Sequence, residues 1–401
     1  MSFNEWKEVK LEDVVDTISK RHKFDKDKII LINTSDVLEG KVLNHEYVQN
    51  ENLKGQFKKS FQKNDILYSE IRPQNKRFAY VDFQSDDYVA STKLMVLRKK
   101  NEMITSNFLY QILKSDDLIN ELQVIAESRS GTFPQITYNE LSRMKIKLPP
   151  LDEQKAIAHI LSTLDDKIEV NNQINKTLEN MAQAIFKQWF VDFEFPNEDG
   201  EPYKSSGGEM VESELGMIPK GWEVVKLNSV VDVCYGKNLP TKKLLSDGYP
   251  VFGGNGQIGF YSEYLYEKSQ VLIACRGAAS GKVIVSLPYS FVTNNSLILE
   301  QNGTTVTHEY LKQFCLEKEF YNYATGSAQP QITIANLANA NILIPHRDLM
   351  NMFSLIRNSI DSKVLSLFNE NNKLVAIRDA LLPKLMSGEI RVPLDKEGDA
   401  S

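Results

Sequence analysis

The chain repeats itself, and this repeat constrains the fold more than any other feature of the sequence. The segment WKEVKLEDVVD at residues 6–16 returns as WEVVKLNSVVD at residues 222–232, with seven of eleven positions identical. Farther along, PQIT at residues 134–137 returns at residues 330–333. The residue numbers differ by 216 in the first pair and by 196 in the second, so the second copy is shorter inside. Matching ends around differing interiors predict two domains with a common frame and different ligands.

Each copy continues into a long helical segment. Apolar residues at 157–189 recur at alternating steps of four and three, and residues 353–385 show nearly the same pattern, interrupted only by Pro383. Such spacing is typical of a coiled-coil seam. At about 1.5 Å per residue, each helix would span roughly 55–60 Å. Because a long helix with one apolar stripe needs a partner, the sequence predicts that the two helices form an antiparallel pair with a domain at each end.

The interiors of both copies contain short apolar runs that resemble strands. The first copy has KIILINTSDV, DILYSEI, FAYVDF and KLMVLRK, and the second has QVLIACRG, KVIVSL and SLILEQ. One amphipathic helix is expected near SNFLYQILKSDDLINELQ, with a counterpart near HEYLKQFCLEKEFYNYA. These elements predict two α+β domains rather than a repeated βαβ sheet.

These patterns divide the 401 residues into six parts with pseudo-two-fold symmetry. The predicted parts are 1-150 (first domain), 151-191 (first helix), 192-217 (linker), 218-346 (second domain), 347-387 (second helix) and 388-401 (C-terminal tail). The linker is rich in Gly, Pro, Ser and acidic residues without periodicity, so it is expected to be exposed. The tail is expected to hold a short strand followed by disorder.

The composition indicates a globular, cytoplasmic protein. No apolar run approaches the roughly 18 residues of a membrane span, and the first residues show no secretion or import signal. Cys234, Cys275 and Cys315 form no CxxC pair, so reduced core residues are expected. The net charge of -6 counts against nucleic-acid binding. However, residues 151–220 alone carry 6 Lys+Arg against 14 Asp+Glu, so the acidity lies mainly in the middle of the chain.

Several segments resemble type I restriction-modification specificity subunits. The segment FPQITYNELSRMKIKLPPLDEQKAIAHILSTLDDKIEVNNQINKTLENMAQAIFKQWFVDF, at residues 133–193, closely resembles their central conserved region. GSAQPQITIANLANANILIP and RDALLPKLMSGEI resemble the distal conserved region, and GWEVVKL resembles the start of a recognition domain. The likeness covers nearly the whole chain and is weakest inside the domains. At the start of the second helix, HRDLMNMFSLI stands where the family has the pattern PPLxEQxxI.

The resemblance implies a DNA-reading subunit with no catalytic activity of its own. Each domain would be a target-recognition domain for one half of a bipartite sequence in double-stranded DNA. The helices would act as a spacer and dock two methyltransferase subunits, which would bind S-adenosylmethionine and flip the target adenine. Restriction or translocase subunits that use ATP and Mg would join the same complex, and no membrane is involved.

Motifs for catalysis fail in their context. GNGQIG at residues 254–259 matches GxGxxG, but no helical period follows it, so a hairpin or exposed loop is expected. GAASGK at residues 277–282 is one residue short of a Walker A motif, and Val283 follows where a hydroxyl belongs. Neither NPPY nor DPPY occurs, and the five histidines lack metal-ligand spacing. No cofactor or metal site is therefore predicted in this chain.

The residues alone leave two alternative functions open. One is a fused DNA methyltransferase or nuclease with its own active site, and the missing cofactor and metal motifs count against it. The other is a coiled-coil scaffold that assembles proteins without reading DNA. Sequence-dependent DNA binding would distinguish the proposed reader from this scaffold.

Clusters of lysine and arginine are the candidate DNA contacts, although such clusters can also be ordinary solvated surface. Arg72 and Arg276 occupy similar places after a strand, where a bidentate guanidinium could reach O6 and N7 of guanine. The other candidates are expected mainly at phosphates. The full set is Lys54, Lys58, Lys59, Lys63, Arg72, Lys76 and Arg77 in the first domain and Lys237, Lys242, Lys243, Arg276 and Lys282 in the second.

Two asparagines interrupt the apolar seams of the helices. Asn175 and Asn371 occupy the same place in the two copies. If they are buried, each side chain needs a hydrogen-bond partner, so facing asparagines would fix the register of the helix pair. If they are exposed, they carry no such information.

Overall fold

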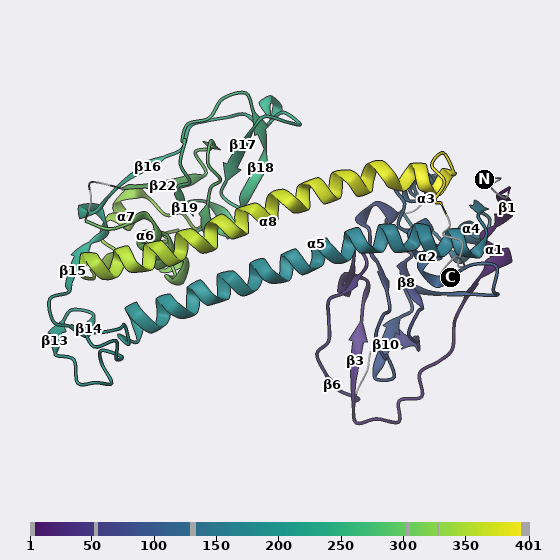
Figure 1. The fold of residues 1–401 in the computed structure, drawn as a ribbon, viewed down its shortest axis with the longest axis horizontal. Helices are drawn as coiled ribbons and strands as arrows, with labels where there is room; N and C mark the ends of the chain where they lie inside the picture. Colours follow the sequence, from purple (N-terminus) through teal and green to yellow (C-terminus); the bar gives the residue numbers. More distant parts are fainter. Residues whose placement is uncertain are drawn as a thin grey trace, which may run out of the picture. The chain divides into compact units, whose positions relative to one another are not determined.

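The computed structural model describes residues 5–51, 55–128, 134–301, 303, 305–326 and 329–393. The chain forms two compact units (Figure 1). Unit 1 comprises Met1–Val170 and Glu370–Ser401, and unit 2 comprises Asn171–Asn369. Each unit therefore combines one mixed α and β region with a part of each long helix.

Unit 1 contains two four-stranded sheets and two smaller pairings. The first sheet has the order β2-β11-β8-β9 and the second the order β6-β3-β10-β7, while β1 pairs with β12 and β4 with β5. The strands are β1 (Lys7–Lys10), β2 (Val15–Thr17), β3 (Lys28–Ile32), β4 (Val37–Leu38), β5 (Lys41–Val42), β6 (Val48–Gln49), β7 (Phe57–Lys59), β8 (Ile66–Ser69), β9 (Phe78–Tyr80), β10 (Tyr88–Ser91), β11 (Leu94–Lys99) and β12 (Lys145–Leu148).

Helices cover one face of the first sheet of unit 1. They are α1 (Leu11–Val14), α2 (Ser106–Leu113), α3 (Asp116–Glu127), α4 (Tyr138–Ser142) and the long α5 (Leu151–Phe186). Alternate residues of β8 point to opposite faces, as a strand requires. Ile66 and Tyr68 pack against the helices, whereas Leu67 packs in a second core with residues of the other sheet. β8 is thus buried on both faces, and its apolar residues Ile66, Leu67 and Tyr68 reflect this.

Unit 2 repeats this frame with different contents. Its sheets have the orders β16-β22-β19-β20 and β18-β17-β21, and β15 pairs with β23 as β1 pairs with β12. Its helices are α6 (His308–Glu317), α7 (Ile334–Ala338) and the long α8 (Arg347–Ser387). The strands are β13 (Met210–Ser213), β14 (Gly216–Pro219), β15 (Glu223–Lys226), β16 (Val231–Tyr235), β17 (Tyr249–Gly253), β18 (Gly256–Tyr261), β19 (Val271–Ala274), β20 (Val283–Val285), β21 (Phe291–Val292), β22 (Ser296–Gln301) and β23 (Asn341–Ile344).

The two long helices pair in antiparallel fashion inside each unit. In unit 1, Oδ1 of Asp165 on α5 lies 3.1 Å from Nη1 of Arg378 on α8. Nζ of Lys167 on α5 lies 3.6 Å from Oε1 of Glu370 on α8. In unit 2, Glu179 of α5 contacts Arg357 of α8 at 2.8 Å. The residue numbers of the partners on α8 therefore decrease as the residue numbers on α5 increase, as an antiparallel pair requires. The predicted α+β fold class with two long antiparallel helices is confirmed.

The predicted seams are buried or half-buried at every position but one. The exception is Ile377, whose exposed fraction is 47%, and the neighbouring Arg378 takes a half-buried place instead. This arginine turns toward the helix pair because Asp165 is there to receive it. α8 also continues through Pro383, where the seam pattern is interrupted.

Three details differ from the expectations. The single amphipathic helix predicted in the first domain is two helices, because the Ser115 hydroxyl caps α3 where α2 has ended. The predicted linker contains the strand β13 and the first half of β14, and these two strands form a hairpin. Phe195 from the same segment stacks on Trp222 at a centroid distance of 5.2 Å, so aromatic burial holds part of this segment in place. Residues 388–393 of the tail form no strand.

Candidate nucleic-acid interface

A loop between β8 and β9, residues 70–77, carries the exposed cationic side chain of Arg72. Two backbone hydrogen bonds fix this loop to the PQIT segment: Arg72 N donates to Pro134 O at 3.0 Å, and Ile136 N donates to Glu70 O at 2.8 Å. A short 3-10 turn, Pro73–Asn75, follows Arg72. The loop therefore has a defined backbone rather than a free one.

The loop between β19 and β20 in unit 2, residues 275–282, is fixed in the same way. Gly277 N donates to Pro330 O at 3.1 Å, and Ile332 N donates to Cys275 O at 3.0 Å. These bonds make Gly277 the structural counterpart of Arg72. The repeated PQIT sequence thus has the same task in both copies, which is to anchor the loop that follows a buried central strand.

This equivalence corrects the expectation that Arg72 and Arg276 occupy similar places. Arg276 forms an isolated antiparallel bridge with Gln331, and Ile71 forms the same bridge with Gln135. Arg276 is therefore the counterpart of Ile71 and lies one position before the counterpart of Arg72. The sequence comparison missed this shift because the two loops share no residue pattern around the arginines.

The remaining candidates of unit 1 divide into exposed cations and cations used by the fold. Lys58 and Lys63 are exposed. Lys59 donates its ammonium to Thr92 O and Leu94 O at 3.0 and 2.8 Å, and burial lowers its pKa below the ordinary value. Arg77 donates to Ser35 O at 3.0 Å, and Lys76 pairs with Asp116 at 2.8 Å. Lys54 lies outside the described residues.

The candidates of unit 2 are more exposed. Lys237, Lys242 and Lys243 all have exposed side chains, the last two on a short 3-10 turn, Thr241–Lys243. Lys282 donates to Asn255 Oδ1 at 2.7 Å. Asn255 lies in the turn between β17 and β18, where GNGQIG forms the predicted hairpin. This contact brings the hairpin turn next to the loop at residues 275–282.

Sequence reasoning did not single out Asn255 or Lys93. Lys93 has a half-exposed side chain whose ammonium lies 3.2 Å from Gln135 Oε1 and 3.5 Å from Glu70 Oε2, beside the loop that carries Arg72. Amide and ammonium groups at such a surface can bind phosphates or base edges. A signal for Lys93 existed, because it is the first residue of the predicted strand run KLMVLRK and directly precedes β11. Asn255 lies in GNGQIG, which the sequence predicted to form a hairpin or an exposed loop.

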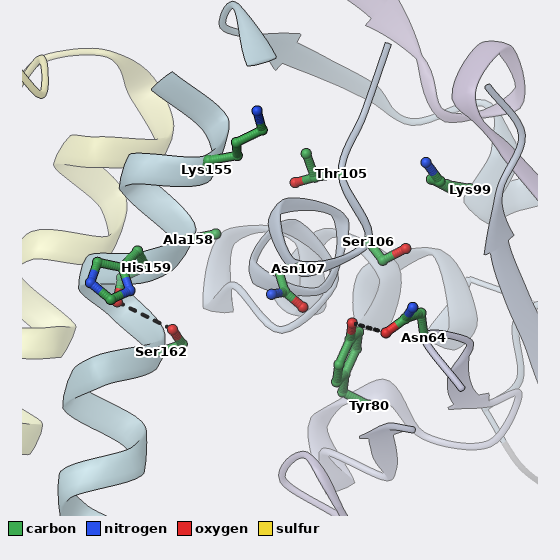
Figure 2. Close-up of a pocket in the computed structure, with 10 residues that line it drawn as sticks. All are labelled: Asn64, Tyr80, Lys99, Thr105, Ser106, Asn107, Lys155, Ala158, His159 and Ser162. Carbon is green, nitrogen blue, oxygen red and sulfur yellow. Dashed lines mark hydrogen bonds between the residues drawn. The ribbon is translucent and has the colours of Figure 1, made fainter. Parts of the chain in front are cut away.

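Unit 1 also contains a polar cavity of about 370 Å³. Figure 2 shows Lys155, His159 and Ser162 projecting from one helix, while Asn64 and Tyr80 lie across the cavity from them. Tyr80 donates its hydroxyl proton to Asn64 Oδ1 at 2.9 Å. The lining residues include no carboxylate or thiol that could act with His159 as a nucleophile and base. The sequence did not predict this cavity.

The two seam asparagines lie in different units, Asn175 in unit 2 and Asn371 in unit 1. Both are half-buried. Among the described residues, the Oδ1 atom of Asn175 is buried without a hydrogen-bond partner. A role of the two residues in fixing the register of the helices stays a prediction.

The described part of the chain offers neither a metal-ligand cluster nor a membrane-spanning helix. No group of three or more His, Cys, Asp or Glu residues there is arranged to hold a metal ion. No helix among the described residues is both long and apolar enough to cross a membrane. Cys234 is half-buried, and Cys275 and Cys315 are buried; all three are free.

Comparison with known proteins places these features in a family. The model of the type I restriction modification DNA specificity domain matches the chain twice, at residues 4–180 and 219–372. The HindI specificity subunit of Haemophilus influenzae is 32% identical over 97% of this chain and all of its own length. The MjaIX specificity subunit of Methanocaldococcus jannaschii is 28% identical over 72% of this chain and 70% of its own. Both are described as specificity subunits of type I restriction enzymes.

The fold comparison agrees with the sequence comparisons. The crystal structure of the type I restriction-modification S subunit from M. genitalium is similar to this chain with a TM-score of 0.57 at 18% identity. The match covers 96% of both chains. The likeness at this identity concerns the fold, including its two repeated regions.

Proposed function

The chain belongs to the family of type I restriction-modification specificity subunits, and we propose that each of its two globular domains reads one half of a bipartite DNA target. Subunits of this family recognise a DNA sequence and are not enzymes. Membership of the family therefore favours a DNA reader over the two alternatives, a fused methyltransferase or nuclease and a scaffold that does not read DNA. The proposed target-recognition domains are residues 1-150 and 218-346, and the proposed spacer helices are 151-191 and 347-387.

One observation carries this proposal: the same anchored loop bears different side chains in the two units. The hydrogen bonds to Pro134 and Pro330 fix the loops identically, yet Arg72 stands in one loop where Gly277 stands in the other. A shared frame with exchanged side chains is what two readers of different sequences require, because base edges are distinguished by donor and acceptor patterns. The exposed lysines around the loops would contact phosphates.

Partners of the chain are DNA and methyltransferase subunits, as membership of the family implies. We propose two methyltransferase subunits that carry S-adenosylmethionine, and restriction subunits that use ATP and Mg. In unit 2, the long helices keep apolar side chains exposed despite their pairing, including Leu355 with an exposed fraction of 74%. Exposed apolar groups on a paired helix support a docking role. The other exposed apolar side chains there are Ile174, Met181, Met352, Leu365 and Phe368.

We also propose that the helices set the separation of the two half-sites. α5 has 36 residues and α8 has 41. Their apolar seams bury against each other within each unit, which makes a stiff element. A rigid pair of this length would fix the number of base pairs between the two readers.

A domain exchange tests the proposed function. Residues 218-346 are replaced with the corresponding domain of the HindI specificity subunit, and the complex with the methyltransferase subunit is assembled on a pool of random duplexes. The selected sequences should change in one half-site only, because the first domain is untouched. Complex formation should persist, because α5 and α8 are retained. Changes in both half-sites, or no sequence selection by the native complex, would contradict the proposal.

A further inference from the structure

The loop at residues 70–77 holds two residues in the left-handed backbone region. Arg72 has a φ of 45° and Lys76 a φ of 51°. Their structural counterparts in unit 2 are glycines, Gly277 with a φ of 73° and Gly281 with a φ of 88°. The second pair follows from hydrogen bonds, because Ser69 N donates to the carbonyl after Lys76 just as Ala274 N donates to the carbonyl after Gly281. Side chains are unfavourable in this region, whereas glycine tolerates it.

The fold accounts for the side chain of Lys76. Its ammonium pairs with Asp116 in the first turn of α3. Between the two strained residues, Gln74 N donates to Gln123 Oε1 of the same helix at 3.2 Å, and Pro73 is buried. The contacts of Pro73 and Gln74 dock the loop on α3, and Lys76 adds only an exposed ion pair, which contributes little to the docking.

Burial does not account for Arg72. Its side chain is exposed, so packing offsets little of the backbone strain. Its backbone N–H bonds Pro134 O, but Gly277 makes the same bond to Pro330 O without a side chain. This backbone hydrogen bond therefore needs the backbone conformation at this position, and a glycine makes it as well as an arginine does. Strained residues of this kind are concentrated at functional sites.

We propose that Arg72 is the specificity-determining residue of the first domain and reads a G·C pair through a bidentate contact to guanine O6 and N7. This inference rests on the proposed function. The docked loop fixes the backbone from which the guanidinium extends, which reduces the entropy lost on binding. In unit 2, the only arginine of the described loop at residues 275–282 is Arg276, in extended backbone with φ -143° and ψ 147°. The two domains present their guanidinium groups from neighbouring, non-equivalent positions and so read at different offsets within their half-sites.

The test is Arg72→Gly in the complex with the methyltransferase subunit, with Lys76→Gly as a matched control. Arg72→Gly should keep or raise the unfolding midpoint, because it relieves strain at a position where Gly277 shows that glycine fits. Its affinity for the native target should fall at least about tenfold. In a random duplex pool it should lose the preference for one base pair in one half-site. Lys76→Gly should keep that preference.

A second variant tests the offset. Ile71→Arg combined with Arg72→Gly gives the first domain the arrangement of Arg276 and Gly277, and it should move the G·C preference within the same half-site. The inference is overturned if Arg72→Gly keeps every base preference, weakens all duplexes equally or lowers the unfolding midpoint. Unchanged preferences in Arg72→Gly beside clear selection by the native complex would refute this inference alone. Absence of selection by the native complex would refute the proposed function as well.

Discussion

In each unit, a lysine at a domain helix pairs with an aspartate on a long helix, but the two units use residues at different positions for this contact. Asp165 of α5 and Asp361 of α8 occupy the same place in the repeat. Lys114 pairs with Asp165, and Lys312 pairs with Asp361 at 2.8 Å. The lysines are not counterparts, however. The capping threonines Thr105 and Thr307 align α2 with α6, and Lys312 then lies one helical turn before the counterpart of Lys114.

The arginines that complete these clusters also come from different places. In unit 1, Arg378 reaches Asp165 from the other long helix. In unit 2, Arg357 lies one turn before Asp361 on the same helix and binds Glu179 of the other helix in bidentate fashion at 2.8 and 3.0 Å. The aspartate is kept and its partners are replaced. Each unit therefore has an aspartate paired with a lysine and an arginine at this place, but the lysine and the arginine come from different positions in the two units.

The beginning of each domain shows a sharper contrast. In unit 1, the indole N–H of Trp6 donates to Glu153, whose buried carboxylate also accepts two hydrogen bonds from Arg391. In unit 2, the counterpart of Glu153 is Leu349, which is buried. Trp222 packs instead among aromatic rings, and its N–H has no partner among the described residues. The hydrogen-bonded cluster of Trp6, Glu153 and Arg391 in unit 1 thus corresponds to an aromatic cluster around Trp222 in unit 2.

The largest effect is expected from removing Arg357. Its guanidinium is 1% exposed and holds two carboxylates, so Arg357→Ala should lower the free energy of unfolding by about 3 kcal/mol. The matched variant Arg378→Ala should cost about 1 kcal/mol, because that side chain is 30% exposed. Urea unfolding of both variants measures the difference. Equal losses would show that the two clusters are energetically alike despite their different burial.

A smaller loss in the free energy of unfolding is expected when Glu153 in the hydrogen-bonded cluster of unit 1 is replaced with leucine, the residue that unit 2 has at this place. Glu153→Leu leaves the Trp6 N–H and the Arg391 guanidinium without their shared acceptor, at a cost of about 2 kcal/mol. Adding Arg391→Ala to this variant should cost little more, since the arginine has then already lost its carboxylate. Urea midpoints of the single and double variants provide the measurement. Additive losses would mean that Arg391 stabilises unit 1 through contacts other than Glu153.

The sequence predicted the parts of the fold that depend on periodicity and repetition. The strand run DILYSEI became β8, whose apolar residues Ile66, Leu67 and Tyr68 are buried on the two faces of the sheet. The residue numbers of Asp165 and Asp361 differ by 196, the same offset as between the two PQIT segments, so their equivalence can be read from the repeat. Apolar strand runs, heptad seams and repeated segments can be recognised in a single sequence, so the elements that depend on them were predicted.

The candidate site was predicted less well because side-chain chemistry there depends on contacts between distant segments. Lys59 and Arg77 belong to the predicted cationic cluster, yet their donors are used by backbone carbonyls. The offset between Arg72 and Arg276 became visible only through hydrogen bonds to Pro134 and Pro330. A count of cations in a sequence does not distinguish those that bind a ligand from those that stabilise the fold.

The smallest effect concerns pH and the first residue of α6. His308 is half-buried, its counterpart in unit 1 is Ser106, and burial lowers the pKa of His308 below its ordinary value of 6.5. Lys268, Lys312, Glu309 and Asp361 surround it, and its Nε2 lies 3.3 Å from the hydroxyl of Ser269.

The sign of the expected pH effect follows from this lowered pKa. The unfolded chain takes up a proton on His308 as the pH falls through about 6.5, before the folded chain does. The stability contributed by the neutral imidazole is therefore lost in mild acid and fully present at higher pH. Hydrogen exchange of α6 should accelerate relative to α2 between pH 7.5 and pH 5.5, after correction for intrinsic exchange rates. His308→Ser, which copies Ser106, should remove this difference. If α6 of the variant still loosened in acid relative to α2, other groups would have to explain the pH response of unit 2.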